Sequence, residues 1–359
     1  MSTRQTPLLE PVTTSEPSLV QQILLDIWRT TLDRDVTVAD DFFETGGDSL
    51  LALVTIEQIN QRLGWTLNMG DLLRFRSIEG LTSHKAQPQA ANGERAVIRM
   101  SNQGSRTPLV FLHAGIGTVD GYARLVRLLG ADRGCYGLQS PLLLSSGNRA
   151  VPDTMEGVAE LYADLLEDEF GEDEFHLVGA CAGGAIALEL TRLAEERGLG
   201  LRRTVAIDGY LDVHSTGEPD ARELLFQFRD DIIRLSGTSG AFPDIAPADL
   251  DEDTAIRDAS AAIFGAARAD DPAANAFARR IYAAHCLYAR ALSAYRPEPV
   301  DTDLLLLLAK DNFTVDDWRA AVRGELTAEV MESDSYGLRL CQTDAETLAA
   351  RIEDFVGEE

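Results

Sequence analysis

The stretch Gly179-Ala180-Cys181-Ala182-Gly183 decides the fold. In it, one glycine lies two residues before the cysteine and another lies two residues after it. Residues 175–178 before it form the apolar run Phe-His-Leu-Val, which indicates a buried strand. Residues 185–197 after it are typical of a helix. A strand, a Gly-x-nucleophile-x-Gly turn and a helix make a nucleophile elbow, so Cys181 is predicted to be a nucleophile. The alternative is a glycine-rich turn around a buried structural thiol.

Strand-like and helical patterns alternate on both sides of this elbow. Apolar strand-like runs occur at 97–100, 108–112, 135–138, 175–178, 204–207 and 303–308, and helical patterns at 121–129, 155–170, 185–197, 277–295 and 344–356. This order predicts a largely parallel sheet covered by helices on both faces. Together with the nucleophile elbow it indicates an α/β-hydrolase fold. Residues from about 212 to 275 break the alternation and are predicted to form a helical lid over the site.

The composition limits the classes of partner. The chain has 359 residues, 45% of them hydrophobic, which suits one large and one small domain. A formal net charge of −27 repels nucleic acids and anionic membranes, so we expect neither as a partner. The four cysteines are far apart and form no CxxC pair, so we expect neither a metal site nor a disulfide framework. Without an apolar leader or a long apolar run, the chain is expected to be cytoplasmic, and we expect a monomer.

A second motif, Asp41-Phe-Phe-Glu-Thr-Gly-Gly-Asp-Ser-Leu50, precedes a helical pattern near the N-terminus. Its serine, Ser49, lies at the start of that helix, where the helix dipole accommodates a phosphodiester. A plain N-cap serine is the alternative. The motif closely resembles the attachment motif of peptidyl carrier domains of nonribosomal peptide synthetases. The resemblance implies that Ser49 carries 4′-phosphopantetheine, added by a separate phosphopantetheinyl transferase.

The carrier resemblance divides the chain into two expected domains. Residues 1–16 are expected to be a disordered leader, 17–85 a small four-helix carrier domain, 86–95 a linker and 96–359 the α/β domain. The last of these resembles the thioesterase domains that release peptides from such synthetases. The resemblance implies a peptidyl thioester substrate and upstream condensation and adenylation domains as partners.

Further site residues follow from the thioesterase resemblance. Asp208 comes directly after the run 204–207, where the family has the acid that orients its histidine. The oxyanion hole is expected to use the backbone N–H of Ala182 and that of Ala114, in the loop after the run 108–112. His113 in the same loop is expected to shape the loop or to pack, and not to act as the base.

The general base is where this chain departs from the family. The family's histidine lies before the last helix, and Ser335 occupies that position here. Among the five histidines, His285 is the first candidate and His214 the second. His285 precedes the end of its helix, near Tyr295, by ten residues, or about 15 Å, which places it level with the active edge of the sheet. The alternative for His285 is a structural role among its apolar neighbours.

A cysteine nucleophile can explain how the chain would function without the family's histidine. A free thiol has a pKa of about 8.5, which a helix N-terminus lowers, so we expect Cys181 to need less help than a serine. Its acyl thioester would stay activated, which favours release by cyclisation to a lactone, thiolactone, β-lactone or β-lactam. Hydrolysis to a linear peptide acid is the second hypothesis. A non-catalytic carrier and docking module is the third.

Overall fold

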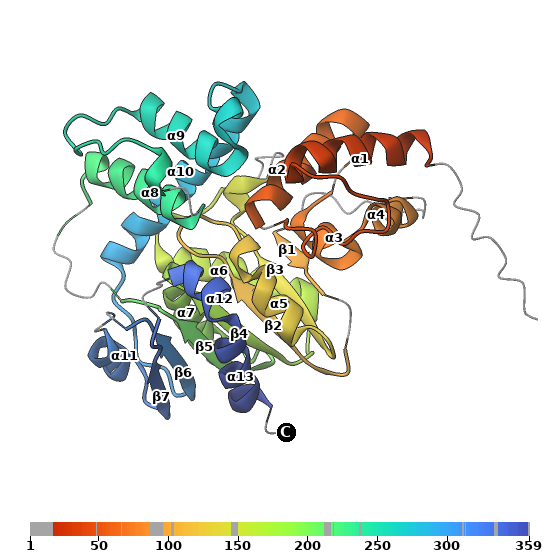
Figure 1. Cartoon of the computed structure of the whole chain (residues 1–359). Coiled ribbons are helices and arrows are strands. Elements are labelled where there is room, and N and C mark those ends of the chain that lie inside the picture. The colour runs from red at the N-terminus through yellow and green to blue at the C-terminus, as the bar shows by residue number, and fades with distance from the viewer. Residues whose placement is uncertain are drawn as a thin grey trace, which may run out of the picture.

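A seven-stranded sheet positions the elbow (Figure 1). The computed structural model describes residues 17–47, 49–65, 67–85, 96–101, 104–144, 150–211, 217, 219–236, 239–310, 312, 314–333 and 337–357. The strands are β1 (Val97–Arg99), β2 (Arg106–Leu112), β3 (Arg133–Leu138), β4 (Phe175–Ala180), β5 (Leu201–Ile207), β6 (Leu304–Leu308) and β7 (Leu326–Val330). They lie in the order β1-β3-β2-β4-β5-β6-β7, and only β1 is antiparallel to its neighbour. The predicted α/β-hydrolase class is confirmed.

The helices of this part follow the strands in the expected alternation. They are α5 (Ala123–Leu129), α6 (Met155–Phe170), α7 (Ala182–Arg197), α8 (Ala221–Leu235), α9 (Glu252–Phe264), α10 (Pro272–Ala294), α11 (Val315–Ala321), α12 (Leu340–Thr343) and α13 (Ala345–Val356). Helices α8 and α9 occupy the segment predicted to be a lid, and pack on α10 at one end of the sheet (Figure 1). The short 3₁₀ turns η1 (Asp120–Tyr122) and η5 (Gly337–Arg339) lie beside each other near the elbow.

Both faces of the central strands are buried under helices. On β2, Leu109 and Phe111 join one hydrophobic cluster, while Val110 and Leu112 join another, because successive side chains point to opposite faces. The first cluster includes residues of α5 and α13, and the second includes residues of α6, α7 and α10. Burial on both faces explains the continuous apolar run 109–112 of β2.

The N-terminal part consists of four helices: α1 (Leu19–Leu32), α2 (Ser49–Leu63), α3 (Met69–Phe75) and α4 (Ile78–Lys85). A capping box starts α1, with the Ser18 side chain accepting from the N–H of Gln21 and the Gln21 side chain accepting from the N–H of Ser18. Trp28 and Phe42 are fully buried and meet edge to face with ring centroids 5.0 Å apart. This small core holds the helices together. The predicted leader, 1–16, and linker, 86–95, lie outside the described residues.

The four-helix part packs directly on the larger part (Figure 1). Helix α3 contacts β1, where a Cβ on Gly70 would come within 2.2 Å of the Arg99 carbonyl oxygen. The Arg127 guanidinium of α5 lies 5.7 Å from the centre of the Phe43 ring. Helix α2 contacts both η1 and helix α9. The helix that begins at Ser49 therefore lies against the elements that surround the elbow.

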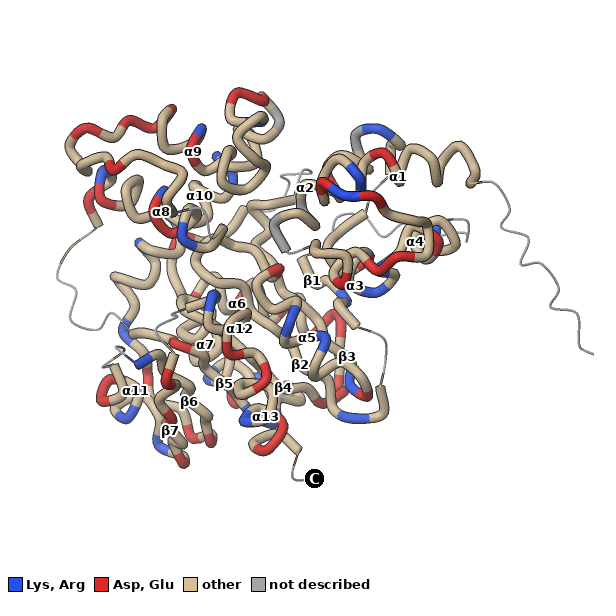
Figure 2. The backbone as a smooth tube through the Cα atoms, viewed as in Figure 1, with Lys and Arg blue, Asp and Glu red and all other residues tan. Residues whose placement is uncertain are grey.

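Charged residues lie mainly on helices and loops, and the central strands carry few (Figure 2). None of the described helices is long and apolar enough to cross a membrane. Within the described ranges, no group of three or more His, Cys, Asp or Glu side chains is arranged to hold a metal ion.

Candidate active site

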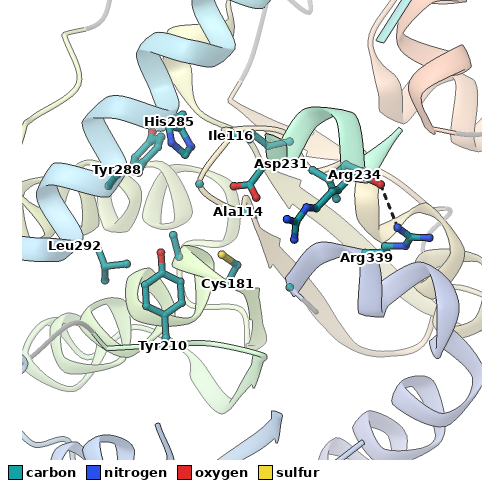
Figure 3. A pocket seen from close by; sticks show the side chains of 15 residues that line it. Ala114, Ile116, Cys181, Tyr210, Asp231, Arg234, His285, Tyr288, Leu292 and Arg339 are labelled. Atoms are coloured by element: carbon teal, nitrogen blue, oxygen red, sulfur yellow. Dashed lines mark hydrogen bonds between the residues drawn. The ribbon is translucent and has the colours of Figure 1, made fainter. Parts of the chain in front are cut away.

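The backbone at Cys181 has the conformation of a nucleophile elbow. Cys181 follows β4 directly, is the N-cap of α7 and has a φ of 54°, a value that non-glycine residues seldom adopt. The turn is tight, because a Cβ on Gly179 would come within 2.0 Å of the Gly183 carbonyl oxygen. The strained turn lifts the Cys181 side chain out of the end of the sheet and into a pocket (Figure 3).

The close contacts of the elbow make Gly183 sensitive to substitution. A Cβ on Gly183 would lie 2.6 Å from the His113 carbonyl oxygen and 2.8 Å from that of Leu112. Because both atoms belong to backbone, Gly183→Ala should lower the free energy of unfolding by about 2–3 kcal/mol. Urea denaturation measures the change. Gly240→Ala is the control, because nothing lies within 4 Å of its added Cβ; equal stabilities for the two variants would contradict the prediction.

Two backbone N–H groups, those of Ala182 and Gly115, lie near enough to the Cys181 sulfur to lower its pKa. Ala182 is the residue expected from the sequence. The second N–H belongs to Gly115, one residue after the expected Ala114, whose carbonyl oxygen accepts hydrogen bonds from His113 and Gly117. Two convergent N–H donors beside a nucleophile are the arrangement that stabilises an oxyanion.

The environment of Cys181 does not make its thiol acidic. The pKa of Cys181 is raised to about 12, chiefly by burial and also by the negative charges of Asp231 and Asp208, against the lowering by the two N–H groups. The expectation that a thiol at a helix N-terminus would ionise with little help is therefore wrong. Desolvation outweighs the helix terminus here. Cys181 rests as a thiol, so its proton needs an acceptor.

Asp208 lies where the sequence placed it, directly after β5, but its carboxylate is fully engaged. Oδ1 accepts from the backbone N–H of Ala309 at 3.0 Å and from the Asn312 side chain at 2.8 Å, and Oδ2 accepts from the backbone N–H of Gly337. Among the described residues no imidazole contacts it. Gly337 also packs beside Cys181, since its Cβ would lie 3.8 Å from that of Cys181. Asp208 thus ties the segment after Ser335 to the elbow.

The predicted bases have different places in the structure. His214 and Ser335 lie outside the described residues. His285, on α10, lines the same pocket as Cys181, and burial lowers the pKa of its imidazole to about 4. One ring nitrogen donates to the backbone of Leu224, while Nε2 is buried without a hydrogen-bond partner. No described side chain is hydrogen-bonded to the Cys181 sulfur.

His113 lies behind the site. It is fully buried, its Nδ1 lies 2.7 Å from the Ala114 carbonyl oxygen and its Nε2 lies 2.5 Å from the Tyr162 hydroxyl. Burial lowers the pKa of His113 to about 4. These contacts fix the loop that supplies the Gly115 N–H, in keeping with the loop-shaping role expected for His113.

The pocket around Cys181 also contains polar residues that the sequence analysis missed. Asp231 and Arg234 reach it from α8, Tyr210 from the chain after β5 and Arg339 from η5 (Figure 3). Asp231 belongs to no motif. With Asp230 and Arg234 nearby, it looks in the sequence like part of an ordinary charged face of a helix. Only the folding of α8 over the elbow brings this carboxylate to the thiol.

Two family models match the chain. The model of the thioesterase domain covers residues 107–356, and that of the phosphopantetheine attachment site covers residues 22–84. The chain belongs to the thioesterase domain family. It is a carrier–thioesterase didomain of the type found in nonribosomal peptide synthetases, and its carrier domain takes a covalently attached 4′-phosphopantetheine. The family predicted from the two motifs is confirmed.

The curated relatives of the didomain are much longer synthetases. It is 27% identical over 192 residues to a dimodular nonribosomal peptide synthase of Bacillus subtilis, covering 53% of this chain and 8% of the relative. It is 29% identical over 246 residues to the pyochelin synthetase PchF of Pseudomonas aeruginosa, covering 58% and 13%. The didomain therefore spans only a small part of the length of these relatives.

Solved structures share its fold. A four-domain nonribosomal peptide synthetase, holo-AB3403 bound to AMP and glycine, matches with a TM-score of 0.64 and 24% identity, over 98% of this chain and 27% of that one. The Vlm2 thioesterase domain bound with a dodecadepsipeptide matches with a TM-score of 0.53 and 16% identity, over 73% and 98%. At these identities the likeness concerns the fold.

Proposed function

We propose that this didomain is a release module in which Cys181 accepts the acyl chain from the carrier domain and releases it by intramolecular cyclisation. The observation that carries the proposal is the position of Cys181 at the elbow, beside the backbone N–H groups of Ala182 and Gly115, which act on its thiol. A thiol in this position can attack a thioester carbonyl while the two N–H groups stabilise the oxyanion. The products would be a lactone, thiolactone, β-lactone or β-lactam.

The carrier domain suits the attachment of phosphopantetheine at Ser49. Ser49 is the first residue of the fifteen-residue helix α2, and Gly46 before it has a φ of 102°. A Cβ on Gly47 would lie 2.3 Å from the buried Phe42 ring, so only glycine lets the loop approach this closely. The attached group supplies a flexible thiol on which the acyl chain is carried. The contact of α2 with η1 and α9 supports transfer within one didomain.

Two features favour cyclisation over hydrolysis. Exchange of one thioester for another is close to isoenergetic, so the acyl chain on Cys181 stays activated for attack by its own nucleophile. The pocket is also lined largely by apolar groups, including Ile116, Leu235, Ala289 and Leu292, which disfavour water near the acyl carbon. Hydrolysis to a linear acid remains the second candidate, supported by the family's hydrolase-type fold. A non-catalytic carrier module is the third, and the pair of N–H donors at Cys181 speaks against it.

The variant Cys181→Ser separates these functions. Its acyl-enzyme would be an oxygen ester, which is less activated than a thioester, and the serine hydroxyl is harder to deprotonate. We expect at least about a tenfold slower acylation by a synthetic acyl-pantetheine thioester, with a larger share of linear acid among the products.

Intact-protein mass spectrometry reports the acyl-enzyme, and product masses report cyclic and linear species. Cys286→Ser is the matched control, because Cys286 faces a different pocket on the outer side of α10. Linear acid alone from the wild type would establish hydrolysis, and a wild type that never becomes acylated would leave only the carrier module.

A further inference from the structure

Among the described residues that line the active-site pocket, Asp231 is the one with a carboxylate, and no role has yet been given to it. Asp231 lies on the lid helix α8 and lines the pocket together with Cys181. In Figure 3 its carboxylate lies over Cys181, between His285 and Arg234. Burial raises the pKa of the Cys181 thiol most, and the negative charge of Asp231 is the next largest cause. Helix α8 thus places an acid–base group in the same pocket as the nucleophile.

The other two candidates for proton transfer are engaged or inert. The Asp208 carboxylate accepts three hydrogen bonds, from Ala309, Asn312 and Gly337. His285 has one ring nitrogen bound to the backbone of Leu224, and its burial disfavours the protonated imidazole that a base would form. Among the described residues, none forms a hydrogen bond or an ion pair with the Asp231 carboxylate, and Arg234 on the same helix pairs with Asp230 at 2.7 Å. A carboxylate without a bonding partner is free to accept a proton.

We propose that Asp231 is the general base of this thioesterase, taking the role that histidine has elsewhere in the family. The proposal rests on the release function proposed above. During loading, Asp231 accepts the Cys181 proton as sulfur attacks the incoming thioester, and passes it to the departing thiolate. During release, it accepts the proton of the attacking N–H or O–H group as the new acyl bond forms and the bond to Cys181 breaks. The proton then returns to the Cys181 thiolate, which restores the resting site.

The environment of Asp231 suits a base that works near neutral pH. The pKa of Asp231 is raised to about 6, chiefly by burial and also by the charge of Asp230, while Arg234 opposes both. A base acts in its ionised form, so the rate should rise through about pH 6 and fall below it. The titratable and charged groups around it are Cys181 at the elbow, Tyr210 after β5, Asp230 and Arg234 on α8, His285 and Tyr288 on α10, and Arg339 on η5.

The test follows acylation and deacylation of the didomain by a soluble acyl-N-acetylcysteamine thioester as a function of pH. Asp231→Asn keeps the shape of the side chain but cannot accept the proton. We expect a loss of about 10²–10³-fold in both steps, together with disappearance of the rise near pH 6. Glu223→Gln is the matched control, since it neutralises an exposed carboxylate on the same helix and should change neither rate nor pH profile.

A second variant tests the mechanism without removing the base. Asp230→Asn removes the charge that raises the pKa of Asp231, so the rise in rate should move to lower pH while the plateau at high pH stays near that of the wild type. A purely structural role of Asp231 would not give this displacement. Thermal unfolding of each variant shows that the fold is kept.

The outcomes separate this inference from the function on which it rests. A wild type that is never acylated at Cys181 would overturn both. Normal acylation of the wild type with unchanged rates and pH profile in Asp231→Asn would overturn the role of Asp231 alone. The role of Asp231 would also be overturned if His285→Gln abolished the rise in rate near pH 6 while Asp231→Asn retained it. The expected losses in Asp231→Asn, with the displaced profile of Asp230→Asn, would establish Asp231 as the base.

Discussion

Replacing Cys181 by alanine should reduce release of an acyl chain by about 10³-fold or more, because the variant has no group that can form the acyl-enzyme. The elbow and both N–H donors stay in place, so substrate binding and the fold should be preserved. Intact-protein mass spectrometry after incubation with an acyl thioester should show an adduct on the thioesterase domain of the wild type and none on that of the variant.

The control for this result is Cys286→Ala. Cys286 is half-buried on α10 and lines a separate pocket, so its removal should leave adduct formation unchanged. Release at the wild-type rate by Cys181→Ala would show that the nucleophile lies elsewhere, and the proposal for the elbow would have to be abandoned.

Replacing Ser49 by alanine should abolish attachment of phosphopantetheine, since alanine has no hydroxyl that can form the phosphodiester bond to this group. After treatment with a phosphopantetheinyl transferase and coenzyme A, the wild type should gain the mass of one phosphopantetheine group and the variant none. The thioesterase domain is untouched, so the variant should still process a soluble acyl thioester. Transfer of a chain loaded on the carrier domain should be lost completely.

The matched control is Ser83→Ala, which removes an exposed hydroxyl from α4 of the same domain. It should be modified as fully as the wild type. Modification of Ser49→Ala would place the attachment at another residue. Loss of soluble-thioester processing in that variant would instead show that Ser49 belongs to the release site.

Most of the sheet could be predicted because its strands are buried on both faces. β6 is an unbroken run of leucines, and β4 and the C-terminal half of β5 are fully buried and mostly apolar, so they stand out in the sequence. β7 was missed for the opposite reason. It is the edge strand next to β6, its residues Leu326–Val330 alternate without a fully buried position, and Val330 is 59% exposed. An edge strand is defined by its pairing with a neighbour, and single-sequence patterns do not contain that pairing.

The candidate site was predictable where backbone geometry dictates the residue. The glycines around Cys181 are required by close backbone contacts, so they mark the elbow in the sequence. The identity of the second N–H donor was missed by one residue, because Ala114 and Gly115 lie in a loop whose exact path depends on the buried His113 and Tyr162. A loop of this kind takes its shape from tertiary contacts that no local pattern reports.

The sequence by itself determined the two motifs, the alternation of strands and helices, and the replacement of the family's histidine by Ser335, because each depends on residue types at fixed spacing. Only the tertiary structure decided the protonation of Cys181 and its neighbours. Burial raises the pKa of the thiol to about 12, and α8 adds the Asp231 carboxylate from fifty residues away. Desolvation and charge act through space, so the acidity of a nucleophile follows from what folds over it.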